Sequence, residues 1–134
     1  MSTKAVYSLG ERGPNGGVIF YLDDSGLHGL EVNREDSHSA IREGGVMWSD
    51  AGDALARTEG GRLPTAQELE LLAKMHEEVG GFKRGQYWSS ERYPGSSILC
   101  WTVTFPFGTR YQLRAFHDSY RGIDGAYVRG IHDF

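Results

Sequence analysis

Three features of the 134-residue sequence predict an α+β fold. Runs of β-forming residues occupy the first and last thirds, and helical patterns lie between them. Aromatic residues make up 12% of the chain, and 19 glycines outnumber 4 prolines, a balance typical of aromatic strands joined by tight turns. The length fits one domain, residues 1–134, whose core is large enough to need no disulfide.

The chain is predicted to begin with a β-hairpin. A Gly-Pro-Asn-Gly-Gly turn at residues 13–17 precedes a run of β-formers at residues 18–22. The segment Asp-Asp-Ser-Gly then reverses the chain toward a returning strand at residues 29–32. The polar stretch at residues 33–45 is predicted to be a loop.

Two helices are predicted next. Ser49 or Asp50 can cap the first, which would end at Gly60. Its apolar side would hold Ala51, Ala54 and Leu55. The second begins at Thr65, which forms a capping box with Glu68, and ends before the glycines at 80 and 81. One face of this second helix would hold Leu69, Leu72, Ala73 and His76.

The last third is predicted to form an antiparallel sheet on which the helices pack. Its strands cover residues 87–90, 98–105, 109–114 and 127–131. The second of these strands alternates strictly, which predicts one apolar and one small or polar face. Its apolar set is Leu99, Trp101, Val103 and Phe105, and the opposite set is Cys100, Thr102 and Thr104.

Cys100 is the one cysteine of the sequence, which excludes an intramolecular disulfide. The first residues lack the apolar segment of a signal peptide, and no run approaches 18 apolar residues. We therefore expect synthesis in the cytoplasm and no insertion into a membrane. Action outside the cell remains compatible with this, since phage structural proteins are released by lysis.

The two parts of the chain differ in charge. Residues 1–81 hold 7 basic and 14 acidic side chains, whereas residues 82–134 hold 7 basic and 4 acidic ones. The basic C-terminal part suits an anionic ligand, although a mixed solvated exterior explains the same counts. Its basic residues are scattered and the pI is about 5.7, so nucleic-acid binding is not expected.

The segment Gly-Arg-Leu-Pro-Thr at residues 61–65, which leads into a helix with Glu68 and Leu69, resembles the signature of the bacterial Lcl C-terminal domain family. Companion motifs follow the family's order along nearly the whole chain. They are residues 13–17 with Phe20 and Tyr21, then Trp48, residues 87–91 and residues 127–129. The resemblance implies a C-type-lectin-like fold, with two helices packed on antiparallel strands and long loops.

The family's named member is the C-terminal domain of a collagen-like adhesin, a trimer that binds sulfated glycans. The resemblance therefore implies ligand recognition by a homo-oligomer, and a trimer would also gain avidity. Many members carry a cysteine pair, which this chain lacks. The motif residues read as scaffold, and we expect structural roles for Arg62, Leu63, Pro64, Thr65, Trp88 and Arg129.

Ligand contacts are expected in the variable stretch near the C-terminus, where aromatic residues and arginines gather. The candidate ligand-binding residues are Tyr93, Phe107, Arg110, Tyr111, Arg114, His117, Asp118, Tyr120 and Arg121. Those expected to be most exposed are Tyr93, Tyr111, Tyr120 and Arg121. Core positions are the alternative for Phe105, Leu113 and Phe116.

No enzymatic constellation is apparent. The five histidines lack zinc-ligand spacing, and the glycine-rich phosphate loops and Gly-x-Ser-x-Gly elbow are missing. One cysteine cannot supply the cysteine pair of formylglycine-generating enzymes. Calcium-binding lectin motifs are also missing, so we expect no cofactor. Pairs of acids at Asp23–Asp24 and at Asp50 with Asp53 leave calcium open, although such acids are ordinary caps.

The sequence favours a non-enzymatic receptor-binding module, for example the tip of a phage tail or fibre, that binds a host cell-surface glycan or protein. The alternative is a structural virion or assembly protein that uses the same surface for subunit contacts. A small hydrolase or redox enzyme is the third class, for which the sequence offers no residue set.

Overall fold

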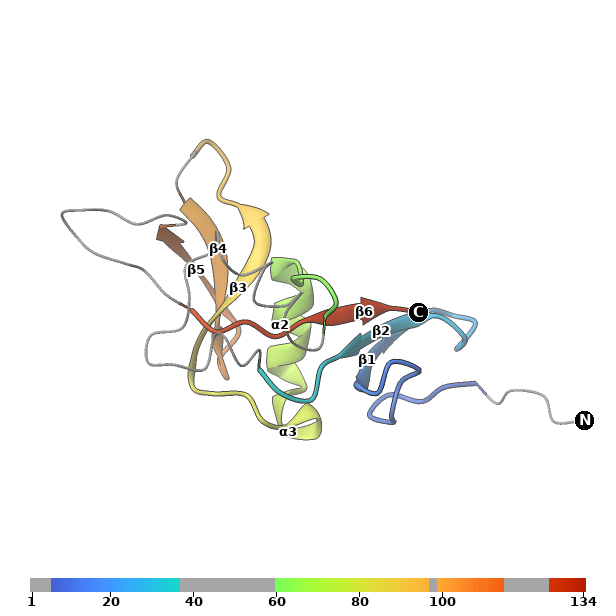
Figure 1. Ribbon diagram of the computed structural model, residues 1–134. Coiled ribbons are helices and arrows are strands. Elements are labelled where there is room, and N and C mark those ends of the chain that lie inside the picture. Colours follow the sequence, from blue (N-terminus) through green and yellow to red (C-terminus); the bar gives the residue numbers. More distant parts are fainter. Residues whose placement is uncertain (1–5, 37–59, 97–98, 115–125) are drawn as a thin grey trace, which may run out of the picture.

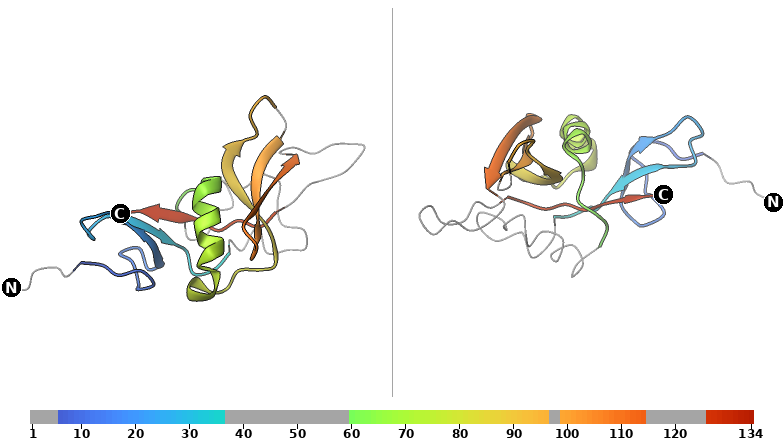
Figure 2. Two further views of the ribbon diagram at one scale, coloured as in Figure 1. Left: turned by 180° about the vertical axis from the view of Figure 1, so that it is seen from behind. Right: turned by 90° about the horizontal axis from the view of Figure 1, so that it is seen from above.

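The computed structural model describes residues 6–36, 60–96, 99–114 and 126–134 (Figure 1). They form two three-stranded antiparallel sheets and two short helices, which confirms the α+β class. The sheet orders are β1–β2–β6 and β3–β4–β5. Helix α2 stands between the two sheets and packs on β3 and β4 (Figure 2). The first expected helix and most of the expected loop after the hairpin lie outside the described residues.

The N-terminal hairpin is confirmed. Strand β1 (Val18–Leu22) pairs antiparallel with β2 (Gly29–Val32), because β-branched and aromatic residues favour the extended backbone. The turn between them is fixed by Asp23, whose Oδ1 accepts hydrogen bonds from the Ser25 amide at 3.0 Å and hydroxyl at 2.6 Å. This is the ordinary turn role of an aspartate.

The expected closing strand at residues 127–131 is wrong in position. The strand β6 (Ile131–Asp133) starts later and joins the hairpin by pairing with β2. Tyr127 instead forms an isolated parallel bridge with Tyr87 in the other sheet. The chain therefore crosses from one sheet to the other over residues 128–130, and this crossing ties the two sheets together.

The capping box is confirmed, and helix α2 (Ala66–Lys74) begins where it predicts. The Glu68 amide donates to Thr65 Oγ1 at 3.1 Å, and Glu68 Oε1 accepts from the Thr65 amide at 2.7 Å. The predicted continuous helix is interrupted at Met75, whose ψ of 16° departs from helical geometry, and α3 (His76–Val79) follows. Neither described helix is long and apolar enough to cross a membrane.

The second sheet consists of β3 (Gly85–Arg92), β4 (Leu99–Phe105) and β5 (Thr109–Arg114). Val103 and Phe105 pack with α2 and the hairpin in the main core, and Phe105 is thus a core residue. The predicted small or polar face of β4 is nevertheless covered. Cys100 is fully buried there, because a second apolar cluster containing Trp88 and Val128 lies against it.

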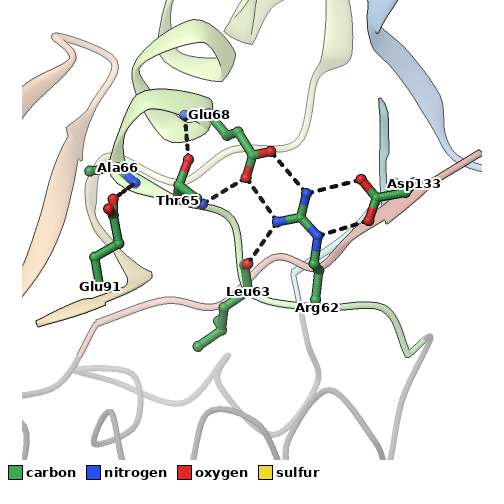
Figure 3. Close-up of polar contacts among 7 residues, drawn as sticks. All are labelled: Arg62, Leu63, Thr65, Ala66, Glu68, Glu91 and Asp133. Atoms are coloured by element: carbon green, nitrogen blue, oxygen red, sulfur yellow. Dashed lines mark hydrogen bonds and ion pairs between the residues drawn. The ribbon is translucent and has the colours of Figure 1, made fainter. Parts of the chain in front are cut away.

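The corner before α2 is held by a network of charges (Figure 3). Arg62 donates to both carboxylate oxygens of Glu68, each at 2.9 Å, and to both of Asp133 at 3.0 and 3.1 Å. Glu91 accepts a bond at 2.8 Å from the Ala66 amide at the helix start. These contacts join β6, the corner, α2 and β3, so Arg62 has the structural role expected of it.

A buried carboxylate shapes the glycine-rich turn at residues 13–17. Glu31 on β2 is fully buried and accepts hydrogen bonds from the Asn15 amide at 2.7 Å, the Asn15 side chain at 2.9 Å and the Gly17 amide at 2.6 Å. A Cβ atom at Gly17 would lie 2.3 Å from the Val32 carbonyl oxygen. The glycine is therefore required by close approach of the two backbones.

Candidate functional site

One face of the second sheet, at the β4–β5 hairpin, carries an aromatic–arginine surface, formed by Tyr93 just after β3, Trp101 on β4 and Arg110 on β5. The Tyr93 and Trp101 rings pack at 4.9 Å between centroids, with planes inclined by 60°. The Arg110 guanidinium carbon lies 5.7 Å from the centroid of the Trp101 ring. Strand pairing brings these residues together, since Arg110 on β5 faces Val103 on β4, two residues from Trp101.

Arg110 is fixed in place by Glu70 on α2. Its Nε and Nη2 atoms each donate to one Glu70 oxygen at 2.9 Å, a bidentate pair between helix and sheet. The hydrogen bonds from Arg110 lower the pKa of Glu70, so this carboxylate stays charged at neutral pH. The guanidinium is thereby oriented, and its charge is already balanced within the protein.

The turn of the same hairpin projects a second aromatic side chain. Phe107 is 67% exposed, and the Arg84 guanidinium carbon lies 5.4 Å from its ring centroid. The turn rests on α2, because a Cβ atom at Gly108 would lie 3.5 Å from the Ala73 methyl carbon. The exposed ring is therefore presented from a supported turn.

Beside this turn lies a cavity of about 190 Å³, here called the basic pocket. Its lining combines aromatic and apolar residues with a histidine and two basic residues. The lining residues are His76, Phe82, Lys83, Arg84, Phe105 and Pro106.

A larger open groove of about 590 Å³, here called the helix groove, lies between α2 and the N-terminal β1–β2 hairpin. Apolar side chains form its base and charged ones its sides. It is lined by Tyr21, Leu30, Gln67, Glu68, Glu70, Leu71 and Lys74. Glu70 thus belongs to the wall of this groove and also holds Arg110, so the groove and the aromatic–arginine surface are neighbours.

The structure places the predicted site residues unevenly. Phe107 and Tyr111, which are 67% and 53% exposed, are accessible as expected. Tyr93 is only partly buried, less open than its turn-rich context predicts, because its ring packs on Trp101. Strict alternation along β5 puts Tyr111 on the face opposite Arg110. The structure therefore does not gather all candidates on one surface.

The backbone of Arg114 pairs with Leu99 at the end of β5. Four predicted contacts lie outside the described residues: His117, Asp118, Tyr120 and Arg121.

Three residues of the surfaces described above were not among the sequence-predicted candidates: Glu70, Arg84 and Trp101. The alternating pattern of β4 predicts Trp101 on the core face, and the partly buried Trp101 does pack against the main core. Glu70 lies one residue after the apolar position Leu69 of α2, so an outward direction was predictable from helix periodicity. The pairing of Glu70 with Arg110 on β5 was not predictable, because no local sequence pattern indicates a contact between residues 40 positions apart.

The described residues contain no group of three or more His, Cys, Asp or Glu side chains placed to hold a metal ion. Of the calcium candidates, Asp23 bonds to Ser25, and Asp50 and Asp53 lie outside the described residues. No protein-family model matches the chain, and a search of curated proteins finds no significant match.

Proposed function

We propose that this chain is a non-enzymatic recognition module that binds a cell-surface receptor through the β4–β5 hairpin. The observation that supports this most is the fixation of Arg110 by Glu70 beside Trp101 and Tyr93. Binding is favoured when contact side chains are already ordered, because their rotamer entropy is not lost on association. Tyrosine, tryptophan and arginine are also the residue types that contribute most at interfaces.

A C-type-lectin-like fold is part of the proposal. Its support is the combination of two short helices with antiparallel sheets and the family motifs around residues 61–69 and 87–91. The Arg62 network gives those motifs a shared structural purpose, since it joins the helix corner to the C-terminal strand. Release from a bacterial cell as part of a virion, and assembly as a trimer, belong to the same proposal.

The test is binding of the labelled chain to whole bacterial cells and to a glycan array, with the oligomeric state measured by light scattering. The double variant Tyr93→Ala/Arg110→Ala removes two members of the surface and leaves the buried core intact. We expect it to bind at least about tenfold more weakly than the native chain.

Tyr21→Ala is the matched control, since Tyr21 is a tyrosine with 46% exposure on the other sheet. Cell binding should be unchanged in this variant. Equal loss in both variants, or none in either, would show that the hairpin is not the receptor surface. A folded oligomer that binds no cell and dissociates on Arg110→Ala would favour the structural virion or assembly protein.

A further inference from the structure

The structure separates the cations of the C-terminal part by whether they already have an anionic partner. Arg129 is paired with Asp36, and Arg110 with Glu70. Lys83 and Arg84, in contrast, form no ion pair with any carboxylate in the described part of the chain. Both line the basic pocket, so two positively charged residues border one small cavity.

The buried acid Asp36 is paired with Arg129 and forms no ion pair with Lys83 or Arg84, although the charge of Lys83 acts to lower the pKa of Asp36. Asp36 accepts from Arg129 Nε at 2.9 Å and from the Tyr87 hydroxyl at 2.8 Å, so its oxygens are already bonded. The Tyr87 hydroxyl in turn accepts a hydrogen bond from the Lys83 backbone amide at 2.8 Å, which fixes the chain beside the pocket. The rim of the pocket therefore attracts an anion.

The rest of the lining restricts the chemistry of that anion. Phe82 and Pro106 supply the apolar part of the lining, with the buried Phe105 behind them, and Arg84 lies over the exposed ring of the neighbouring residue Phe107. Sugar hydroxyls usually donate to carboxylate or amide side chains, and among the described residues the lining contains neither Asp, Glu, Asn nor Gln. His76 Nδ1 is also occupied, since it bonds the Ala73 carbonyl at 2.7 Å.

The size of the cavity agrees with a single side chain. Its 190 Å³ equals the liquid volume of about six water molecules. An extended peptide places alternate side chains on opposite sides, so an apolar residue can enter the pocket while flanking carboxylates remain at its rim. Arg84 favours such a partner, because a guanidinium binds a carboxylate through two parallel hydrogen bonds.

We propose that the basic pocket binds an acidic protein segment in which an apolar side chain lies between carboxylates. The apolar side chain packs on Phe82 and Pro106, and the carboxylates pair with Lys83 and Arg84. The inference rests on the proposed function, because it assigns a protein ligand to the turn end of the same hairpin. The receptor at this position is thus a protein surface.

The test uses the full chain, ¹⁵N-labelled, titrated with acetylated and amidated tripeptides and followed by NMR. The probe is Asp-Leu-Glu, and the controls are Asn-Leu-Gln, which lacks the charges, and Asp-Gly-Glu, which lacks the apolar group. Free D-glucuronate and inorganic sulfate are two further control ligands, which test binding of an acidic carbohydrate and of a simple anion. We expect saturable shifts at Lys83, Arg84 and Phe107 with Asp-Leu-Glu, and at least about tenfold weaker binding of the other four.

Arg84→Gln and Lys83→Gln should each weaken Asp-Leu-Glu binding by about tenfold. Lys74→Gln is the matched control, because it removes the same charge from the wall of the helix groove and should change nothing. Circular dichroism confirms that the three variants are folded.

Three results would overturn the inference. They are D-glucuronate or sulfate binding as tightly as Asp-Leu-Glu, Asp-Gly-Glu binding equally well, and Lys74→Gln weakening binding as much as Arg84→Gln. Loss of cell binding in Tyr93→Ala/Arg110→Ala without peptide binding to the native chain would leave the proposed function standing and this inference wrong. Peptide binding without any cell binding would leave the pocket standing as a peptide site and the proposed function wrong.

Discussion

Arg129 and Asp36 form a buried ion pair, with Nε and Oδ1 2.9 Å apart, although the two residues lie 93 positions apart in the sequence. The guanidinium also donates to the carbonyl oxygens of Gly80 and Gly81 at 2.9 and 2.7 Å, and it lies 4.1 Å from the Phe82 ring centroid. Burial raises the pKa of Asp36, and the charge of Arg129 opposes this rise. The pair joins the end of the hairpin segment to the turn after α3 and to the crossing between the sheets.

Removing either partner should destabilise the fold strongly, because the other charge would remain buried without compensation. We expect Arg129→Met and Asp36→Asn each to lower the free energy of unfolding by about 3–5 kcal/mol in urea titrations. The double variant should lose less than the sum of the two single losses. Additive losses would mean that the two groups stabilise the fold independently.

Gly17→Ala should be far more harmful than Gly10→Ala. The added methyl at position 17 would lie 2.3 Å from a backbone oxygen and 2.8 Å from Glu31 Oε2, so the turn would have to move. Gly10 has a φ of +88° but nothing among the described residues within 4 Å, so alanine there costs only backbone strain. We expect losses of about 3 and about 1 kcal/mol respectively, from thermal unfolding. Similar losses would assign the cost at position 17 to something other than close approach.

Arg62→Gln should reduce the dependence of the free energy of unfolding on pH in the acidic range. Burial alone would raise the pKa of Glu68, but hydrogen bonds from Arg62 and Thr65 lower it, and Arg62 likewise lowers the pKa of Asp133. A lowered folded-state pKa contributes stability above the unfolded values of 4.5 and 3.8, and this stability is lost as pH falls through the folded values.

Urea midpoints measured between about pH 6 and about pH 2 should therefore fall less steeply in Arg62→Gln than in the native chain. Arg84→Gln removes the same charge from a side chain that pairs with no carboxylate in the described ranges, and its slope should match that of the native chain. If the urea midpoint of Arg62→Gln depends on pH as steeply as that of the native chain, the Arg62 network is not the cause of the acid sensitivity.

Cys100 should be inert toward thiol reagents in the folded protein. It is fully buried, and burial raises the pKa of its thiol although the charge of Arg92 opposes this. A chromogenic disulfide reagent should label the unfolded chain in guanidinium chloride within minutes and leave the native chain largely unreacted. Rapid labelling under native conditions would indicate that β4 opens readily.

The elements that sequence reasoning located well are those specified by neighbouring residues. Thr65 and Glu68 lie three positions apart, so their reciprocal bonds can be recognised without any knowledge of the fold. The hairpin at residues 18–32 is similarly local. The closing strand was misplaced because Tyr127 to Ile131 has β-forming character throughout, and only the position of two separate sheets decides which part pairs.

The candidate site was harder to predict for the same physical reason. Exposure of Phe107 follows from its place in a turn, whereas neutralisation of Arg110 depends on a helix 40 residues away. The burial of Cys100 and Thr102 could not be predicted either, because small and polar residues on a strand do not indicate that a second layer packs on that face. Composition identified the kind of surface, and only tertiary contacts show which cations already have an anionic partner.

The pairing of β2 with β6 has a consequence for how this protein is made. Strand β2 is the central strand of its sheet, and the bond between Asn33 and His132 spans 99 residues. A ribosome must therefore release the chain through β6 before this sheet can be completed, and contacts of such long range slow folding. During synthesis the N-terminal hairpin is formed before β6 is available, so the edge of β2 that later pairs with β6 stays unpaired. Truncated products and stalled chains of this protein are therefore candidates for chaperone binding.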